Sequence, residues 1–195
     1  MAASFEFRAA VREDCENIAR LYRISSDGVA DYIWTSLADE GEDILAVGQR
    51  RYEREDTAFS YQNCHVAESD GAVVGMLSAF PLYVDPDEHE SDPVLAPYSE
   101  LEEDASLYVC GVAMYPEYRG MGGGSRFMEL AEQLAQERGL TKLSLIVFEQ
   151  NAGALKLYER LGYAEVARRP VYPHPLIHFT GDAILMVKHI GNSEN

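Results

Sequence analysis

Residues 112–125 of this chain read VAMYPEYRGMGGGS, which places four glycines within five residues. A β-rich run, 107–114, precedes these glycines, and a helical pattern, 122–138, begins among them. Consecutive backbone N–H groups without side chains over them form a concave nest, and the start of a helix adds the positive end of its dipole. Because a Cβ would keep a phosphate away from the backbone, glycine suits such a nest. The stretch therefore predicts an anion-binding turn.

Two other phosphate-binding motifs are excluded by the spelling of this turn. A P-loop ends in Gly-Lys-Ser or Gly-Lys-Thr, whereas Gly124 is followed directly by Ser125. A dinucleotide-binding G-x-G-x-x-G counted from Gly122 would need glycine where Phe127 stands. A turn that binds nothing is disfavoured, because glycines weaken the start of a helix. Arg119 either adds a charge-assisted bond to the anion or braces the turn.

Strand and helix patterns alternate downstream of the turn. Gly139 and Gly162 occupy positions at which glycine commonly ends a helix. A Pro- and His-rich loop, 169–182, separates the last two β-rich runs. The predicted elements are a strand at 141–147, a helix at 152–160 and closing strands at 163–168 and 183–189.

Upstream of the turn the patterns predict a strand, three helical pieces and a hairpin. Ile18, Leu21 and Tyr22 lie three to four residues apart, as one apolar face of a helix requires. Asp70-Gly71 between two β-rich runs is a hairpin signal. The predicted elements are a strand at 5–11, helices at 14–23, 29–37 and 44–54, and strands at 63–68 and 72–80.

Residues 85–104 differ in composition from the rest of the chain. They contain nine acidic residues, no Lys or Arg, and the prolines Pro86, Pro93 and Pro97. Such a stretch buries little apolar surface. We expect an exposed acidic loop inserted in the domain.

The glycine turn and a second segment together resemble a known family. Arg119-x-x-Gly122-x-Gly124, preceded by Pro116 and a strand, resembles the first cofactor-binding motif of the GNAT family of N-acetyltransferases. The run NAGALKLYERLGY at 151–163 is similar to that family's second cofactor-binding motif. The resemblance implies an α/β (α+β) fold with a mixed, mostly antiparallel sheet of about six to seven strands. Helices would flank this sheet, which would be splayed between its fourth and fifth strands.

The resemblance also implies acetyl-CoA as the cosubstrate, and no metal. The main chain of Val112 and Met114 would pair with the pantetheine arm, and Asn151 would reach the cofactor through its side-chain amide. Arg119 stands at the mouth of the turn. The backbone amides that would bind the pyrophosphate are those of Gly120, Gly122, Gly123, Gly124 and Ser125.

Tyr158 is the expected catalytic residue. Asn151, Ala154, Leu155 and Tyr158 stand at i, i+3, i+4 and i+7, so they share one helix face. In direct transfer an amine attacks the thioester, and the tyrosine hydroxyl would protonate or hydrogen-bond the departing sulfur and also contact the cofactor. A core tyrosine with its hydroxyl bonded elsewhere is the alternative.

The general base is not assigned by the sequence. Family members often carry a glutamate on the strand before the turn, but the aligned positions hold Ser106 or Cys110, neither of which is a plausible base at neutral pH. Glu103, Asp104 and Tyr108 are nearby candidates, and a water chain or a strand bulge is a further alternative. Cys110 as a nucleophile is less favoured than a buried thiol, because nothing identifiable beside it lowers its pKa.

Acceptor pockets in this family lie between the first two helices and in the loop joining the last two strands. Here those regions are residues 25–52 and 169–182. Aromatic and imidazole side chains in them serve a pocket or ordinary packing: Tyr32, Trp34, Tyr172, His174 and His178. Pro173 and Pro175 prevent a helix around the two histidines, so a metal pair at helical spacing is disfavoured.

Length and charge limit the possible functions. The 195 residues fit a single domain over 1–195, and the net charge of −17 disfavours a nucleic-acid surface. The acidity favours cationic substrates or serves solubility. Cys15, Cys64 and Cys110 form no pair typical of a disulfide framework or zinc site. With no secretory signal at 1–8 and no apolar run of ~20 residues for a membrane helix, we expect a cytoplasmic protein that binds no membrane.

The sequence leads to one principal function and two alternatives. We expect an N-acetyltransferase that transfers acetyl from acetyl-CoA to a primary amine of a small molecule or protein by direct nucleophilic attack. A catalytically inactive acyl-CoA-binding sensor or scaffold is the first alternative, and use of another acyl donor is the second. A homodimer is compatible with the sequence, which does not identify the acceptor.

Overall fold

The computed structural model describes residues 4–191 and contains one seven-stranded sheet with flanking helices. The strands are β1 Glu6–Ala9, β2 Cys64–Ser69, β3 Ala72–Leu82, β4 Ser106–Met114, β5 Lys142–Phe148, β6 Ala164–Pro170 and β7 Asp182–His189. The α-helices are α1 Cys15–Ser25, α2 Val29–Leu37, α3 Ile44–Tyr52, α4 Ala96–Ser99, α5 Gly123–Glu137 and α6 Ala152–Arg160. Short 3-10 turns are η1 Arg12–Asp14, η2 Tyr61–Asn63 and η3 Pro116–Tyr118.

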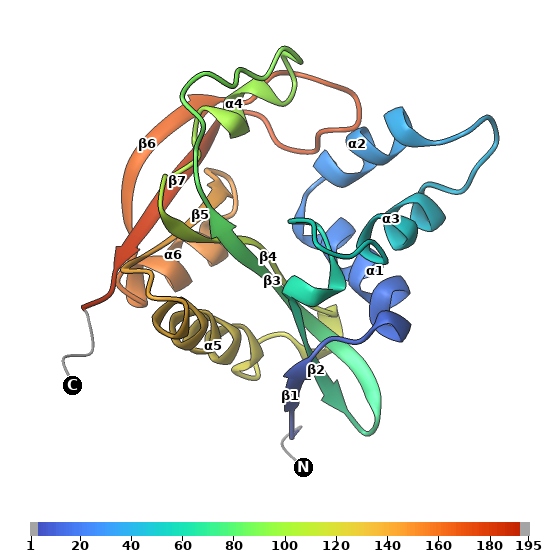
Figure 1. Ribbon diagram of the computed structural model, residues 1–195, viewed down its shortest axis with the longest axis vertical. Coiled ribbons are helices and arrows are strands. Elements are labelled where there is room, and N and C mark those ends of the chain that lie inside the picture. Colours follow the sequence, from blue (N-terminus) through green and yellow to red (C-terminus); the bar gives the residue numbers. More distant parts are fainter. Residues whose placement is uncertain (1–3, 192–195) are drawn as a thin grey trace. The chain divides into compact units, whose positions relative to one another are not determined.

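The strand order is β1-β2-β3-β4-β5-β7-β6 (Figure 1). The β4–β5 pair is parallel, whereas β1–β2, β2–β3, β5–β7 and β6–β7 are antiparallel. The parallel register comprises Leu107↔Leu143 and Tyr108↔Ser144, near the start of both strands. A mixed, mostly antiparallel sheet with a short parallel junction confirms the predicted fold class.

Backbone contacts divide the described residues into two compact units. The N-terminal unit holds the described residues up to Ala79 together with Gly111–Met128. The C-terminal unit holds Phe80–Cys110 and the described residues from Glu129 onward. Strands β3 and β4 and helix α5 each continue from one unit into the other.

An aromatic cluster forms much of the core of the N-terminal unit. Tyr22 of α1 lies with its ring centroid 6.2 Å from Trp34 of α2 and 5.7 Å from Tyr52 of α3. Trp34 is only 1% exposed, and a Cβ added at Gly48 would come within 2.5 Å of its ring. Helices α1, α2 and α3 therefore pack through these rings, and α3 needs glycine where it meets the indole.

The C-terminal unit is built on the antiparallel strands β5, β7 and β6. Leu145 pairs with Met186 across β5 and β7, and both side chains are buried. The strands β6 and β7 form a hairpin, in orange and red in Figure 1, with the loop 171–181 at its end. This hairpin presents the loop that the sequence associates with the acceptor.

The prediction of a wholly exposed acidic loop at 85–104 is wrong at its centre. Val94 is 4% exposed and Leu101 is 0% exposed, and the one-turn helix α4 lies between them. The Asp92 carboxylate accepts a hydrogen bond of 2.8 Å from the Val94 amide. Two apolar residues of the segment are therefore buried, while most of its acidic residues stay exposed.

Candidate functional site

The glycine turn connects β4 to α5 in the N-terminal unit. Gly120 and Gly122 have left-handed φ angles of +74° and +89°. The Arg126 amide donates to the Gly122 carbonyl at 3.1 Å, which begins the helical hydrogen-bond pattern. The amides of Gly123, Gly124 and Ser125 precede it in the first turn of α5, where an α-helix supplies no acceptor. The turn thus presents backbone donors at a helix start, as an anion site requires.

The glycines of this turn are required for two different reasons. A Cβ added at Gly120 or Gly122 would meet no atom within 4 Å, so the space beside both residues is open and the backbone conformation alone calls for glycine. A Cβ at Gly123 would lie 2.9 Å from the Met114 sulfur. A Cβ at Gly75 would lie 2.2 Å from the same sulfur, so Met114 is wedged between two glycines.

Arg119 braces the turn in this structure. Its Nε donates a hydrogen bond of 3.1 Å to the carbonyl oxygen of Met114, the last residue of β4. This bond is the brace that the sequence left open, and a bond from Arg119 to an anion stays a prediction. The main chain of Val112 and Met114 lies on β4, and its pairing with a pantetheine arm stays a prediction.

Asn151 and Tyr158 lie on the same helix, α6, in the C-terminal unit. Asn151 is the N-cap residue, and its Oδ1 accepts a hydrogen bond of 3.2 Å from the Ala154 amide. The backbone amide of Asn151 donates a hydrogen bond of 2.9 Å to the Phe148 carbonyl, which fixes the turn between β5 and α6. The side-chain oxygen is used in the cap, so the predicted contact with a cofactor would have to be made by the Nδ2 donors.

Tyr158 is half-buried and lies in the last turn of α6. Burial raises the pKa of its hydroxyl to about 12, because desolvation disfavours the phenolate. The ring packs against Tyr163, with centroids 5.8 Å apart. Desolvation also raises the pKa of Tyr163, whose buried hydroxyl has no hydrogen-bond partner among residues 4–191. Tyr158 thus stays protonated at neutral pH, as a hydrogen-bond donor must.

Ser106 and two of the general-base candidates, Glu103 and Asp104, have structural partners. Ser106 is fully buried, donates to the Glu103 carbonyl at 2.8 Å and lies 2.7 Å from the Ser144 hydroxyl. The Glu103 carboxylate pairs with Lys142, and Asp104 accepts a bond of 2.9 Å from the Val84 amide. These contacts favour structural roles for Ser106, Glu103 and Asp104.

The Tyr108 ring packs edge-on against Phe80, with centroids 5.7 Å apart, and Cys110 is partly exposed. The structure therefore does not single out a side chain as the base.

The residues expected to line an acceptor pocket have diverse surroundings. Trp34 is core packing, as described above, and Tyr32 lies half-buried on α2. In the loop 171–181, Tyr172 is 47% exposed and His178 is exposed. His174 accepts a bond of 3.2 Å from the Leu176 amide through Nδ1, which shapes the loop itself.

Sequence reasoning missed an aromatic cluster beside this loop. Phe148, at the end of β5, lies with its ring centroid 4.9 Å from Phe179 of the loop and 6.1 Å from Tyr98 of α4. Burial raises the pKa of Tyr98 to about 12, and its buried hydroxyl has no partner within the described chain. The rings come from three separate segments, so no local pattern could have joined them.

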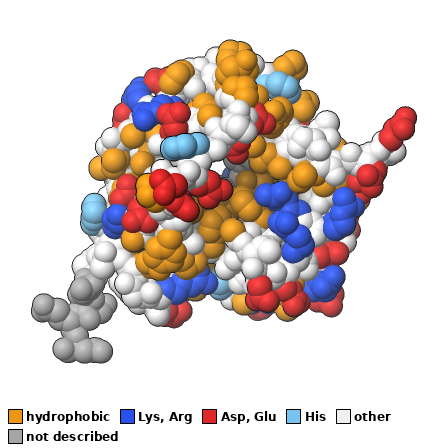
Figure 2. Space-filling view, turned by 45° about the horizontal axis from the view of Figure 1, so that its top comes forward, with side chains coloured by type: hydrophobic (Ala, Val, Ile, Leu, Met, Phe, Trp, Pro, Cys, Tyr) orange, Lys and Arg blue, Asp and Glu red, His pale blue; other side chains and the backbone are white. Residues whose placement is uncertain are grey.

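The loop between α2 and α3 gathers negative charge. Figure 2 shows these acidic side chains in red at the right-hand projection. Glu42 pairs with Arg50, and Asp43 caps α3 by accepting from the Leu45 amide at 3.0 Å. Asp39 and Glu40 are exposed. Two of these four carboxylates therefore serve the loop itself.

Searches for metal and membrane features gave no candidates. Over residues 4–191, no three His, Cys, Asp or Glu side chains are grouped so that they could hold a metal ion. Within the same range, no helix has both the length and the apolar character needed to cross a membrane.

A family model described as the acetyltransferase (GNAT) family matches residues 30–163, more than half of the chain. Three curated relatives match shorter segments. The uncharacterized N-acetyltransferase YycN of Bacillus subtilis is 39% identical over 33% of this chain and 40% of its own length. The thialysine N-epsilon-acetyltransferase of Bos taurus is 35% identical over 29% of this chain and 34% of its own. The ribosomal protein bS18-alanine N-acetyltransferase of Escherichia coli is 34% identical over 43% of this chain and 55% of its own length. The chain thus spans less than two thirds of the length of these relatives.

Solved structures match nearly the whole chain at low identity. A crystal structure described as an acetyltransferase has a TM-score of 0.66 and 21% identity, and the match covers 95% of this chain and 100% of that one. The putative acetyltransferase YncA from Salmonella typhimurium, solved with its cofactor acetyl-CoA, has a TM-score of 0.61 and 18% identity over 99% and 98%. These likenesses show a shared fold.

Proposed function

Because the chain belongs to the acetyltransferase (GNAT) family, we propose that it transfers acetyl from acetyl-CoA to a primary amine. The observation that carries this proposal is the glycine turn, with its donors at the start of α5 and open space beside Gly120 and Gly122. The pyrophosphate would bind the amides of Gly120 and of Gly122 to Ser125. The Nδ2 of Asn151 and the main chain of Val112 and Met114 would bind other parts of the cofactor.

Tyr158 is proposed to assist the departure of the thiol by hydrogen bonding. The amine attacks the thioester carbon, a C–N bond forms, and the C–S bond breaks with its electron pair on sulfur. A tyrosine pKa of about 12 lies well above the ~8.5 of a simple thiol, so complete proton transfer to the thiolate is unfavourable. A hydrogen bond from Tyr158 to the developing thiolate is the role that this pKa supports.

The proposed acceptor is a primary amine of a small molecule or of a peptide. The curated relatives are named for both kinds of acceptor, thialysine in one and an alanine of a ribosomal protein in another. The amine must lose a proton to attack, and the structural partners of Glu103 and Asp104 favour water as the carrier. The net charge of −17 attracts a cationic amine.

Two measurements test this proposal. Isothermal titration with coenzyme A tests the turn, and release of free thiol from acetyl-CoA in the presence of a panel of amines tests the transfer. We expect both binding and turnover. Binding without turnover on any amine would favour a sensor or scaffold, and preference for a longer acyl-CoA would change the assigned donor.

A further inference from the structure

The loop 171–181 is closed at its base by a backbone hydrogen bond. The Val171 amide donates to the Gly181 carbonyl at 2.8 Å, directly after β6 and directly before β7. Gly181 has a φ of +88°, so the chain turns sharply at this point. The position of the loop is therefore set by what holds its base.

The base of the loop is tied to the turn that precedes α6. The Glu149 amide donates to the Asp182 carbonyl at 2.9 Å, and the Asp182 amide donates to Glu149 Oε2 at 3.3 Å. Gln150 Nε2 donates to Thr180 Oγ1 at 3.0 Å. Glu149 and Gln150 immediately precede Asn151, the N-cap of α6. The loop and the start of α6 thus share one junction.

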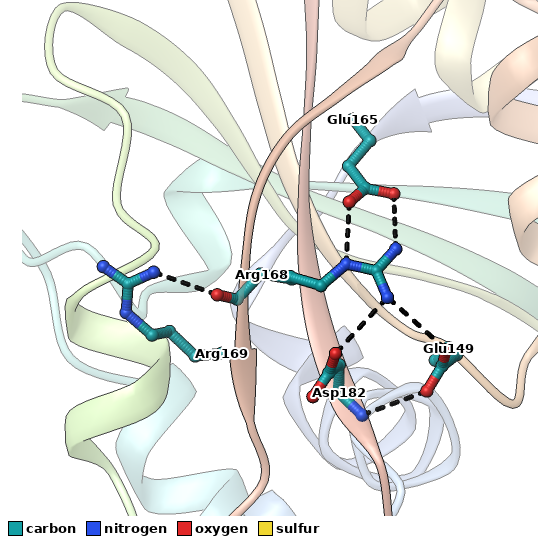
Figure 3. Close-up of polar contacts among 5 residues, drawn as sticks. All are labelled: Glu149, Glu165, Arg168, Arg169 and Asp182. Carbon is teal, nitrogen blue, oxygen red and sulfur yellow. Dashed lines mark hydrogen bonds and ion pairs between the residues drawn. The ribbon is translucent and has the colours of Figure 1, made fainter.

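Arg168 lies in the middle of this junction and contacts three carboxylates (Figure 3). Its Nε and one terminal nitrogen bind the two oxygens of Glu165, both at 2.8 Å. The other terminal nitrogen lies 3.4 Å from Glu149 Oε1 and 3.3 Å from Asp182 Oδ2. One guanidinium therefore bridges β6, the first residue of β7 and the turn before α6.

Removing this charge would change the junction more than the fold. Arg168 is 43% exposed, and single exposed ion pairs contribute little to the stability of a protein. Without the guanidinium, however, the carboxylates of Glu149 and Asp182 would repel each other across the junction they now close. The hydrogen bonds of the Glu149 and Asp182 amides would then open more often.

We propose that Arg168 is a positioning residue that holds the loop 171–181 against the turn 149–151. Its function is to fix the loop relative to Asn151 and the start of α6. The effect on acceptor binding rests on the proposed function, whereas the tie itself does not.

Arg169 offers a matched control on the same strand. It is also 43% exposed, and its Nε binds Glu100 at 2.6 Å instead of the junction carboxylates. Figure 3 shows its guanidinium on the other side of β6 from that of Arg168, with one hydrogen bond of 2.9 Å to the Arg168 carbonyl oxygen and none to the three carboxylates. Arg168→Gln and Arg169→Gln therefore remove the same charge from neighbouring positions and differ in the partners left behind.

Amide hydrogen exchange tests the tie without any activity measurement. In Arg168→Gln we expect the Glu149 and Asp182 amides to exchange about fivefold faster, the order of effect of an exposed ion-pair network. In Arg169→Gln these amides should exchange as in the unchanged protein. Equal exchange in Arg168→Gln and the unchanged protein would overturn the proposal, and so would equal acceleration in both variants.

Steady-state kinetics test the consequence for the acceptor. Arg168→Gln should raise KM for the amine by roughly fivefold and leave KM for acetyl-CoA unchanged, with recovery in Arg168→Gln/Glu149→Gln because the repulsion is removed. A roughly fivefold fall in kcat of Arg168→Gln with both KM values unchanged would contradict the positioning role. No recovery of KM in the double variant would contradict it as well. If the unchanged protein acetylates no amine, the proposed function fails, and the exchange experiment still decides whether Arg168 holds the loop.

Discussion

At the scale of single residues, glycines in the same turn are held by different constraints. Gly122 needs its left-handed φ and faces open space, whereas Gly123 needs the absence of a Cβ beside Met114. Only open space leaves room for a ligand. Gly122 is therefore the position where binding and stability can be separated.

Gly122→Ala should reduce coenzyme A affinity at least tenfold while costing about 1–2 kcal/mol of unfolding free energy for the left-handed φ. The added Cβ would stand where the phosphate is proposed to approach. Isothermal titration and urea denaturation measure the two effects.

Gly139 supplies the control for this substitution. Its φ is +69°, and a Cβ there would also meet no atom within 4 Å. Gly139→Ala should cost a similar unfolding free energy and leave coenzyme A affinity unchanged. Equal coenzyme A affinity in Gly122→Ala and Gly139→Ala would contradict the proposal that the phosphate binds at the turn.

Tyr158→Phe should lower kcat by tenfold or more with little change in coenzyme A affinity, because the hydrogen bond forms as sulfur acquires charge. The control is Tyr163→Phe, which removes a buried hydroxyl without a partner among the described residues and should leave kcat unchanged.

The pH profile gives a second readout of Tyr158. With a pKa near 12, the hydroxyl stays protonated as pH rises, so no loss of activity between pH 8 and roughly pH 10 should come from it. A descending limb in this range that disappears in Tyr158→Phe would contradict the pKa on which the role depends.

The sequence predicted the glycine turn before α5 and the start of α6 as structural elements, but not every contact within them. The glycines and Asn151 lie in local motifs, so their positions follow from spacing. The bond from Arg119 to the Met114 carbonyl depends on how the turn folds back, and the sequence left it as one of two alternatives. Trp34 was a pocket candidate but is buried in the core. The sequence could not separate the two settings, because an aromatic residue is typical of both.

At the scale of helices and strands, the clearest element is α6. Its bounds, Ala152–Arg160, are those predicted, as are those of α2, Val29–Leu37. For α6 the N-cap residue Asn151 and the left-handed Gly162 shortly after the C-terminal end explain this agreement. Most other predicted ends differ from the observed ones by one or two residues, because the hydrophobic period does not define where the last hydrogen bond of an element forms. Helix α4 was missed because four residues carry no period.

Substitutions at Asn151 separate its cap from its proposed cofactor contact. Asn151→Asp keeps an oxygen for the Ala154 amide and suits the helix dipole, but it lacks the Nδ2 donors. We expect unchanged thermal stability and weaker coenzyme A binding.

Asn151→Ala should lose both properties, with about 1 kcal/mol of unfolding free energy lost with the cap. Thermal denaturation measures the stability of both Asn151 variants, and isothermal titration measures their coenzyme A affinity. Unchanged coenzyme A affinity in Asn151→Asp would show that Asn151 only caps α6 and would contradict its proposed contact with the cofactor.

At the scale of the whole molecule, the net charge of −17 acts on every ligand that approaches. Raising ionic strength from about 0.05 to 0.5 M should lower kcat/KM for a cationic amine several-fold, because salt screens long-range attraction. A neutral amine of the same shape is the control and should show a weaker dependence. Equal salt dependence for both would assign the acidity to solubility.

The wedge of Met114 between Gly75 and Gly123 limits how this chain can change over generations. A Cβ at either glycine would come closer than 3.0 Å to the Met114 side chain, so the thioether must move or position 114 must become smaller to admit it. Shortening Met114 first would leave a void between two bare backbones. Packing therefore couples the three positions, and a substitution at one of them changes the contacts of the other two.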